Sequence, residues 1–267
     1  FTALCLRGIY SNSRISTKLK VTILVFAILL APCKAVYSVL LLLVFLIPQS
    51  RFKSKAESWL FKFGVSFLAC ASILLMRLPS LLDLTGVSGG ESRSFEKWGQ
   101  TGVLYNLSDI LDDPFGFASM FLRTLDQKVD WWIETLVGSS LAWFQFEVPW
   151  YVALSFLFVL LLAIPKPSES DLEITLTQKT AFACIFGLGA FFVILSMCLA
   201  FTFNNETLID GVQGRYFLPL LPIFLLAFRN KTIVANKDYS RALLYTIAVL
   251  NVAYVTRIYA MALAGGA

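Results

Sequence analysis

The sequence predicts an all-α polytopic membrane protein. Hydrophobic residues make up 58% of the 267 residues and charged residues only 15%, whereas ordinary soluble domains carry about a quarter charged residues. The mean hydropathy is +0.75, and several uninterrupted apolar stretches approach the length that a helix needs to cross a bilayer. A backbone exposed to lipid has to satisfy its hydrogen bonds within its own segment, so each of these stretches is expected to be a helix.

Seven apolar segments are expected to enter or span the membrane. They cover residues 21–31, 35–48, 59–78, 149–164, 180–203, 215–228 and 242–264. No internal repeat is evident, and no linker rich in Gly, Ser or Pro divides the chain. We therefore interpret residues 1–267 as a single transmembrane domain with short or broken spans and one outer loop over residues 80–148.

The first two segments are expected to form a hairpin. If residues 21–48 were one long span, Lys34 would lie in the middle of the bilayer, where a lysine costs about 2.5–3.5 kcal/mol. If Pro32 and Lys34 instead turn the chain, two short helices form and the basic clusters that flank them share one side. Lys34 then belongs either to a structural turn or to a site for an ion or a lipid headgroup between two half-length helices.

The charges of the loops set the orientation. With that hairpin, the loops on one side hold 14 basic and 5 acidic residues, those on the other side hold 7 basic and 12 acidic residues, and Lys34 is counted apart. An excess of Lys and Arg marks the cytoplasmic side. The basic side is therefore predicted to face the cytoplasm, and the net charge of +5 is assigned to these loops and not to nucleic-acid binding.

An amphipathic helix is predicted within the outer loop. Asp113 suits an N-cap and Pro114 the first helical position. Apolar residues then recur at steps of three and four along one face, at Phe117, Phe121, Leu125, Val129, Trp132 and Leu136. Such a helix is expected to lie along the membrane surface. It serves either as a lid packed on the spans or as a wall that shapes a substrate site.

The residue types present exclude several kinds of chemistry. The chain has no histidine, which excludes an imidazole base or a histidine-ligated metal. Its five cysteines show neither a metal-ligand spacing nor a disulfide pattern. No GxxxxGK[ST], GxGxxG, HExxH or GxSxG motif occurs, so an ATP-driven pump or a serine hydrolase finds no support. Because the first residue is Phe1, the chain is expected to continue upstream.

The string GVQGRYFLPLLP, residues 211–222, places a cation at the start of an apolar segment. Gly211 and Gly214 permit unusual backbone angles and close approach. If a helix begins near Arg215, its N-terminal amides favour an anion there, and the planar guanidinium matches phosphate oxygens. The alternative is a structural arginine that extends to the interface or pairs with Asp210 or Glu206.

Polar residues at the membrane boundary are the candidate site residues. Four of them are candidates for binding a lipid phosphate: Arg215, Gln213, Tyr216 and Lys34. Asp112 and Asp113, with Asp109 nearby, are the candidates for a catalytic base or for ligands of a divalent cation, the candidate cofactor. Adjacent carboxylates need not converge, so helix capping and solvation are the alternative roles for them.

Three stretches resemble a known family. They are GVQGRYFLPLLPIFLLAF, LLAPCKAVYSVLLLLVFLIP and the segment that begins DPFGFASMFLRTL and continues through WWIETLVGSSLAWFQFEVPW. Over about residues 20–260 the chain resembles a bacterial family of predicted polytopic membrane proteins of unknown function. That family is distantly grouped with the GT-C glycosyltransferases, which use polyprenyl-phosphate-linked sugars.

The resemblance implies a GT-C-like helical bundle in the bacterial cytoplasmic (inner) membrane. It implies transfer of a sugar from a polyprenyl-phosphate donor to a cell-envelope glycan on the outer face, with Arg215 in the position to hold the lipid phosphate. The acidic residue typical of GT-C enzymes is expected upstream of Phe1. The alternatives are a transporter or flippase of a lipid-linked saccharide, and a non-catalytic membrane scaffold.

Overall fold

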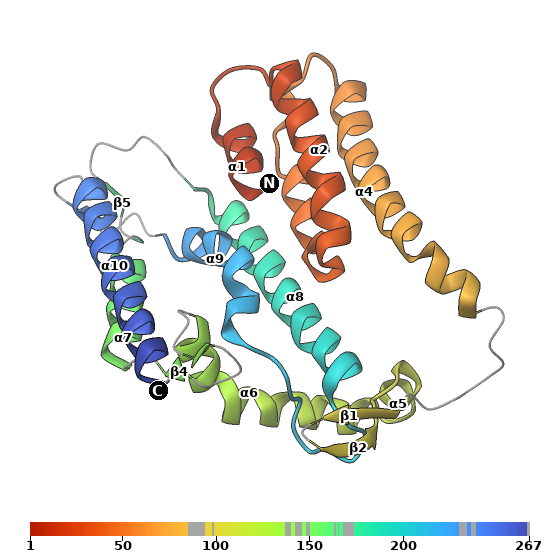
Figure 1. Ribbon diagram of the computed structural model, residues 1–267. Helices are drawn as coiled ribbons and strands as arrows, with labels where there is room; N and C mark the ends of the chain where they lie inside the picture. The colour runs from red at the N-terminus through yellow and green to blue at the C-terminus, as the bar shows by residue number, and fades with distance from the viewer. Residues whose placement is uncertain are drawn as a thin grey trace. The chain divides into compact units, whose positions relative to one another are not determined.

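The structure is a computed structural model, and helices make up most of it (Figure 1). It describes residues 1–84, 94–97, 99–136, 140–141, 146–147, 150–162, 164, 166–167, 174–229, 234–235 and 239–265. The α-helices are α1 (Thr2–Tyr10), α2 (Thr17–Cys33), α3 (Leu42–Phe45), α4 (Lys55–Leu84), α5 (Leu107–Asp112), α6 (Pro114–Leu136), α7 (Trp150–Leu162), α8 (Leu176–Phe201), α9 (Leu221–Phe228) and α10 (Ser240–Gly265).

Within the described residues, three segments are 3₁₀-helices and six short segments are strands. The 3₁₀-helices are η1 (Ala35–Leu41), η2 (Gln49–Arg51) and η3 (Gly214–Leu220). The strands are β1 (Ser94–Lys97), β2 (Gln100–Val103), β3 (Ser140–Leu141), β4 (Phe146–Glu147), β5 (Lys166–Pro167) and β6 (Val234–Ala235). They pair as two antiparallel hairpins, β1–β2 and β3–β4, and one parallel pair, β5–β6. The β1–β2 and β3–β4 hairpins were not predicted within the outer loop.

The contacts of the chain form two compact units. One contains Phe1–Val103 with Cys184–Phe192, and the other contains Leu104–Ala183 with Val193–Ala267. The proposal that the chain forms one transmembrane domain stays a prediction.

In the first unit, α2 packs along α4 (Figure 1). Ile23, Ala27 and Ala31 recur every four residues on α2 and are fully buried, which gives this apolar helix one packed face. The small alanine side chains allow close approach of a neighbouring helix. The hydroxyl of Ser72 on α4 donates a hydrogen bond to the carbonyl oxygen of Ile28 at 3.1 Å.

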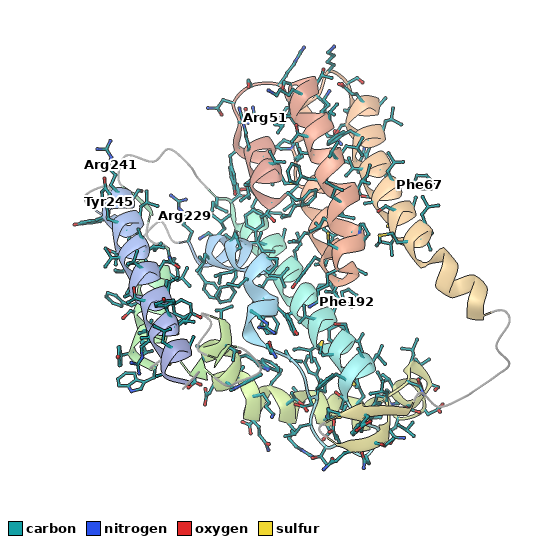
Figure 2. All side chains as sticks on the ribbon, in the orientation of Figure 1. Arg51, Phe67, Phe192, Arg229, Arg241 and Tyr245 are labelled. Atoms are coloured by element: carbon teal, nitrogen blue, oxygen red, sulfur yellow. The ribbon has the colours of Figure 1, made fainter. Side chains whose placement is uncertain are left out.

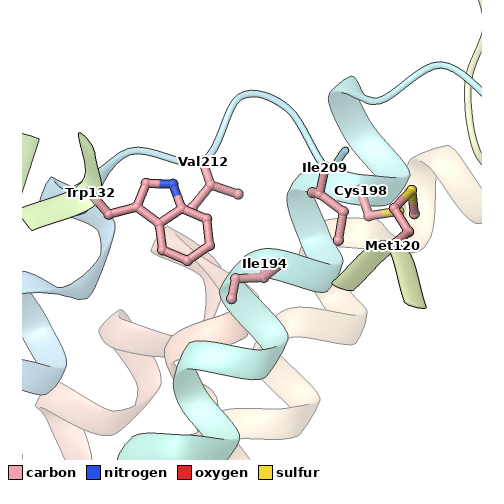
Figure 3. Close-up of a cluster of buried hydrophobic side chains, with 6 residues drawn as sticks. All are labelled: Met120, Trp132, Ile194, Cys198, Ile209 and Val212. Carbon is pink, nitrogen blue, oxygen red and sulfur yellow. The ribbon is translucent and has the colours of Figure 1, made fainter. Parts of the chain in front are cut away.

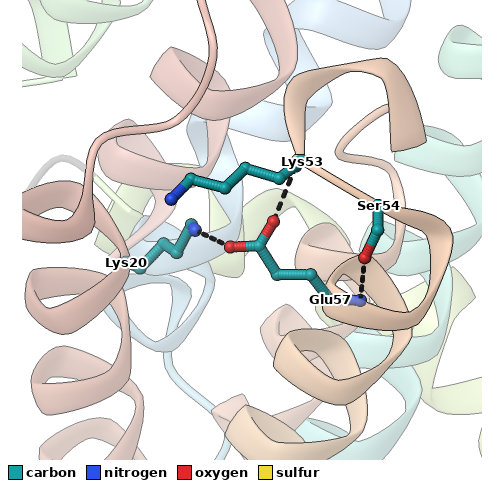
Figure 4. A network of polar contacts seen from close by, with 4 residues as sticks. All are labelled: Lys20, Lys53, Ser54 and Glu57. Atoms are coloured by element: carbon teal, nitrogen blue, oxygen red, sulfur yellow. Dashed lines mark hydrogen bonds and ion pairs between the residues drawn. The ribbon is translucent and has the colours of Figure 1, made fainter.

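The start of α4 is fixed by a capping arrangement that the sequence SKAE specifies (Figure 4). Ser54 accepts a hydrogen bond from the Glu57 amide at 3.1 Å, and the Glu57 carboxylate accepts one from the Lys53 amide at 2.6 Å. The other carboxylate oxygen of Glu57 lies 2.5 Å from Lys20 Nζ on α2. This ion pair joins the starts of two neighbouring helices.

The predicted break at Lys34 is confirmed. Helix α2 ends at Cys33, Lys34 has extended backbone angles (φ −157°, ψ 106°), and η1 begins at Ala35. Pro32 lies in the last turn of α2, where it disfavours helical angles for the residue before it and so weakens the helix end. The two sides of this break are therefore short helices and not one continuous span.

Three helices in the described part of the chain are long and apolar enough to cross a membrane. They are Lys55–Met76 within α4, Leu176–Phe201 (α8) and Ser240–Ala264 within α10. Large apolar side chains are exposed along them, including Phe67 at 72% and Val249 at 67%, and Figure 2 shows Phe67 on the side of α4 away from α2. Apolar surface of this kind is suited to contact with lipid. The seven-segment topology and its orientation stay predictions.

In the second unit, α7 and α10 lie side by side (Figure 1). The rings of Phe156 and Tyr254 meet edge to face, with centroids 6.2 Å apart. Helix α6 begins at Pro114, so the predicted amphipathic helix of the outer loop is confirmed as a helix. It provides the surface on which residues 209–214 are held.

Candidate functional site

The loop before η3 is attached to α6 by two buried threonines. The amide of Ile209 donates to Thr124 Oγ1 at 2.9 Å, and the amide of Gly214 donates to Thr135 Oγ1 at 2.8 Å. Each hydroxyl in turn donates to a carbonyl of its own helix, that of Met120 or Trp131. Because a buried amide without a partner costs about 1–3 kcal/mol, both hydroxyls stabilise one path for this loop.

The spacing of the two threonines is within reach of the loop segment that they hold. Thr124 and Thr135 are eleven residues apart, a rise of about 16 Å on an α-helix, and three turns bring them to nearly the same face. Ile209 and Gly214 are five residues apart, and five extended residues span about 16–18 Å. The two hydrogen bonds therefore hold the loop against α6 at both of its ends, with the left-handed backbone of Gly211 (φ +77°) between them.

Apolar side chains fill the space beneath the loop (Figure 3). Ile209 and Val212 point from the loop into a cluster with residues of α6 and α8, where each member is at most 6% exposed. The other members are Met120, Trp132, Ile194 and Cys198. Burial of these side chains holds the loop against both helices by the hydrophobic effect.

Glycine is required at two positions of the loop. Gly211 has φ +77°, a left-handed conformation that other residues rarely adopt, and a Cβ there would lie 2.5 Å from Phe201 Cδ1. A Cβ at Gly214 would overlap the carbonyl oxygen of Trp132 and the backbone of Leu136. The two glycines of the GVQGRYF string thus allow the loop backbone to touch α8 and α6.

Helix η3 continues directly into α9, so residues Gly214–Phe228 form one apolar helical segment. Pro219 and Pro222 lack amide donors, so the first two turns lose hydrogen bonds of a regular α-helix. The ring of Phe217 packs on Trp132 of α6, with centroids 5.7 Å apart. The predicted helix at residues 215–228 is confirmed, and its start is fixed on α6.

Arg215 lies in the first turn of this segment and is exposed. Its guanidinium carbon lies 5.8 Å from the ring centroid of Tyr216, a cation–π contact. No carboxylate among the described residues forms an ion pair with it. The alternative in which Arg215 pairs with Asp210 or Glu206 is therefore not what the structure shows.

Gln213 and Tyr216 flank Arg215, and both are half-buried. The Tyr216 amide donates to the Gln213 carbonyl at 3.0 Å, which closes the first turn of η3. The structure thus brings Gln213, Arg215 and Tyr216 together at one helix start on a fixed backbone. A guanidinium with five donors in this position can bind a phosphate or carboxylate oxygen pair.

The aspartates at the α5–α6 junction serve as caps. Asp113 Oδ1 accepts a hydrogen bond from the Gly116 amide at 2.8 Å, and Asp109 Oδ2 accepts one from the Asn106 amide at 2.8 Å. The predicted N-cap role of Asp113 is confirmed. Asp112 is exposed, and in the described part of the chain no three His, Cys, Asp or Glu side chains gather as metal ligands.

Tyr105 lies next to these caps and packs against the cluster beneath the loop. Burial raises the pKa of its phenol, and the neighbouring Cys198, Asp109 and Asp113 raise it further. The phenol is therefore held in its protonated form at neutral pH.

Helix α6 separates the aspartates from Arg215. Asp113 caps its first turn, whereas Gly214 is bonded to Thr135 in its last turn. The intervening length of helix is roughly 30 Å. The catalytic candidates Asp112 and Asp113 therefore lie at the opposite end of α6 from the residues before Arg215, and a catalytic role for these aspartates stays a prediction.

Lys34 belongs to the other unit. It is half-buried between α2 and η1, and its Nζ lies 5.5 Å from the ring centroid of Tyr37. Its carbonyl accepts a hydrogen bond from the Tyr37 amide at 2.9 Å, which begins η1. A role for Lys34 beside Arg215 stays a prediction.

Thr124 and Thr135 are the residues that the sequence pattern did not reveal. The apolar pattern placed the buried face of α6 on a row that includes Val129, which is 40% exposed. The observed buried face is shifted to include both threonines. The signal that identifies them is a pair of threonines three helical turns apart, since a threonine on a buried helix face often bonds a neighbouring backbone.

Comparison with known proteins assigns the chain to a family. No curated protein and no solved structure matches the chain. A family model described as predicted membrane protein, DUF2142, matches residues 1–224, which include α6, the anchored loop and Arg215. The chain therefore belongs to the DUF2142 family of predicted membrane proteins.

Proposed function

We propose that the protein is a membrane glycosyltransferase of the GT-C type. It transfers a sugar from a polyprenyl-phosphate donor to a cell-envelope glycan, on the outer face of the bacterial cytoplasmic membrane. The observation that carries the proposal is the exposed guanidinium of Arg215 at the start of an apolar helical segment. The resemblance of the sequence to proteins distantly grouped with GT-C enzymes supports this reaction class.

Arg215 suits a lipid phosphate in three respects. Its backbone is fixed by the Gly214 bond to Thr135, so the cation is positioned before a ligand arrives. It has no carboxylate partner in the described part of the chain, so its charge is available to an anion. It stands next to exposed apolar surface such as Leu218, which suits the prenyl chain of the same ligand.

The proposed reaction is a displacement at the anomeric carbon of the sugar. A hydroxyl oxygen of the acceptor forms a bond to C1, and the bond from C1 to the lipid phosphate oxygen breaks with its electron pair on that oxygen. The hydroxyl proton passes to the released phosphate or to water, and the products are the glycosylated acceptor and polyprenyl phosphate. Arg215 stabilises the negative charge that develops on the leaving phosphate.

A transporter of a lipid-linked saccharide is the second candidate. It is favoured by two half-length helical segments, η1 with α3 on one side of Lys34 and η3 with α9 after Gln213. Broken helices near substrate sites are a feature of transporters. In this function Arg215 would hold the same phosphate without any bond being cleaved.

Reconstitution in liposomes separates these functions. With a radiolabelled polyprenyl-phosphate sugar and an envelope-glycan acceptor, the wild-type protein is expected to release polyprenyl phosphate and label the acceptor. Arg215→Ala is expected to slow transfer about 100-fold or more, and Arg215→Lys to restore little because it lacks the planar fork.

The matched control is Arg123→Ala, which removes an exposed arginine from α6 and should leave the rate unchanged. Donor movement across the bilayer without cleavage would identify the transporter instead. An unaltered transfer rate in Arg215→Ala would remove Arg215 from the mechanism.

A further inference from the structure

A basic cavity lies between the end of α1 and the start of α2. Its volume is about 470 Å³, and its lining includes the three cations Arg7, Arg14 and Lys18. All three are exposed. Among the described residues, none of those that line the cavity is acidic, and the ion pair between Lys20 and Glu57 in this unit does not involve its three cations. Three unneutralised cations around one concave space favour a bound anion.

Hydroxyl groups complete the polar lining. Ser11, Ser13, Ser16 and Thr22 all contribute to it. The hydroxyls of Ser11 and Ser13 lie 3.0 Å apart, and Ser16 accepts the Leu19 amide at 3.2 Å as the N-cap of α2. Ser16 accepts a bond and can still donate to an anionic oxygen, and so can one of the Ser11 and Ser13 hydroxyls, whereas Thr22 already donates to the Lys18 carbonyl at 2.8 Å.

The start of α2 adds to the positive potential of this cavity. Its first turn carries no acidic residue, and Lys18 occupies it instead. A lysine at this end of a helix is opposed by the helix dipole. A bound anion would offset the positive charges of Lys18, Arg7 and Arg14 and would explain why a lysine occupies this position.

The outer face of α2 points to a lipid as the source of the anion. At 100° per residue, Lys18, Thr22, Val25 and Leu29 share one face, opposite the packed face formed by Ile23, Ala27 and Ala31. Val25 is 46% exposed and Leu29 56% exposed. The face thus passes from a cation and a hydroxyl at the cavity to exposed apolar side chains along the helix.

We propose that this cavity binds the phosphate headgroup of an anionic phospholipid, whose acyl chains lie along Val25 and Leu29. Basic pockets beside membrane helices on the cytoplasmic side recognise such headgroups. The predicted orientation puts Arg7, Arg14 and Lys18 on that side. This site is separate from the proposed function of Arg215, because it is built within the other unit.

The test uses the purified protein in an uncharged detergent. Phosphatidylglycerol and phosphatidylcholine with the same acyl chains are titrated, and the unfolding midpoint and bound lipid are measured. Phosphatidylglycerol is expected to bind and to raise the unfolding midpoint, and phosphatidylcholine is expected to do neither.

The double variant Arg7→Gln with Arg14→Gln should weaken phosphatidylglycerol binding about 10-fold or more. The control Lys53→Gln with Lys55→Gln removes the same charge outside the cavity and should change binding less than about twofold.

Two further measurements test the proposal, one with a Lys18 variant and one with inorganic pyrophosphate. Lys18→Gln should weaken lipid binding without lowering the midpoint of the lipid-free protein, because it removes a cation from a helix N-terminus. Inorganic pyrophosphate should bind much more weakly than the lipid, and equal binding would overturn the lipid assignment in favour of a soluble phosphate. Equal loss of phosphatidylglycerol binding in the cavity and control pairs would overturn the site itself.

Discussion

Position 214 illustrates how one residue fixes the candidate site. Its amide is bonded to Thr135, and the absence of a side chain lets the loop backbone touch Trp132 and Leu136. Arg215 follows directly, so the direction of its side chain depends on this contact. The glycine is therefore needed for packing, although its φ is not in the left-handed region.

Gly214→Ala is expected to destabilise the protein by about 1–3 kcal/mol, because the atoms that its Cβ would meet belong to backbone that cannot turn aside. The measurement is thermal unfolding in detergent. Gly64→Ala in α4 is the matched control, because a Cβ there meets nothing within 4 Å. It should leave the midpoint unchanged or slightly raised, since alanine favours a helix over glycine. Equal midpoints for the two variants would contradict the described packing.

At this scale the sequence pointed to Arg215 but not to what positions it. The glycines, the cation and the following prolines are visible as a string, because they are adjacent in the chain. Thr124 and Thr135 act across 85 and 79 residues of sequence, respectively, and no local pattern pairs a hydroxyl with a distant amide. Their role follows only from the path of the loop along α6.

At the scale of elements, α6 holds the loop that leads to Arg215 and also separates this loop from the aspartates at the start of the helix. Its last turns hold the loop that carries Arg215, and its first turn is capped by Asp113. The helix was predictable because its cap, its proline and its apolar period agree. Its exact buried face was not, because two of the four buried side chains are threonines, which an apolar period does not count.

Substitutions of Asp113 test whether its carboxylate caps α6 or takes part in catalysis. Asp113→Ala is expected to destabilise the protein by about 1 kcal/mol, whereas Asp113→Asn should retain the cap and full transfer activity. Asp112→Ala is the control, since that side chain is exposed. The measurements are thermal unfolding and the liposome assay. A loss of activity in Asp113→Asn with an unchanged midpoint would show that the carboxylate takes part in the chemistry.

At the scale of the whole molecule, the apolar segments identified many of the helices, whereas α1 (Thr2–Tyr10) and α5 (Leu107–Asp112) lie outside every predicted segment. Each of the seven segments corresponds to helical structure, with the break at Lys34 where Pro32 and a cation interrupt the apolar run. The hairpin β1–β2 was not predicted, because its strands are short and polar and lie outside any apolar segment. Which loops face the cytoplasm depends on how the protein is inserted in the membrane. The prediction of this orientation rests on the uneven distribution of Lys and Arg between the loops.

Reporter fusions test this orientation. Ser170 and Gly90, which lie outside the described residues, are predicted on the cytoplasmic and outer sides respectively. A fusion active only in the cytoplasm should work at Ser170 and fail at Gly90, and a fusion active only outside should do the opposite. If both sites report the same side, the predicted topology is wrong and Arg215 loses its outer position.

The central claim is that the Arg215 guanidinium binds a lipid phosphate, and direct binding tests it. Polyprenyl phosphate is titrated into the purified protein in an uncharged detergent, with unphosphorylated polyprenol as competitor. We expect saturable binding that polyprenol does not displace, weakened about 10-fold or more by Arg215→Gln and unchanged by Arg123→Gln. Wild-type affinity in Arg215→Gln, or equal competition by polyprenol, would contradict the claim.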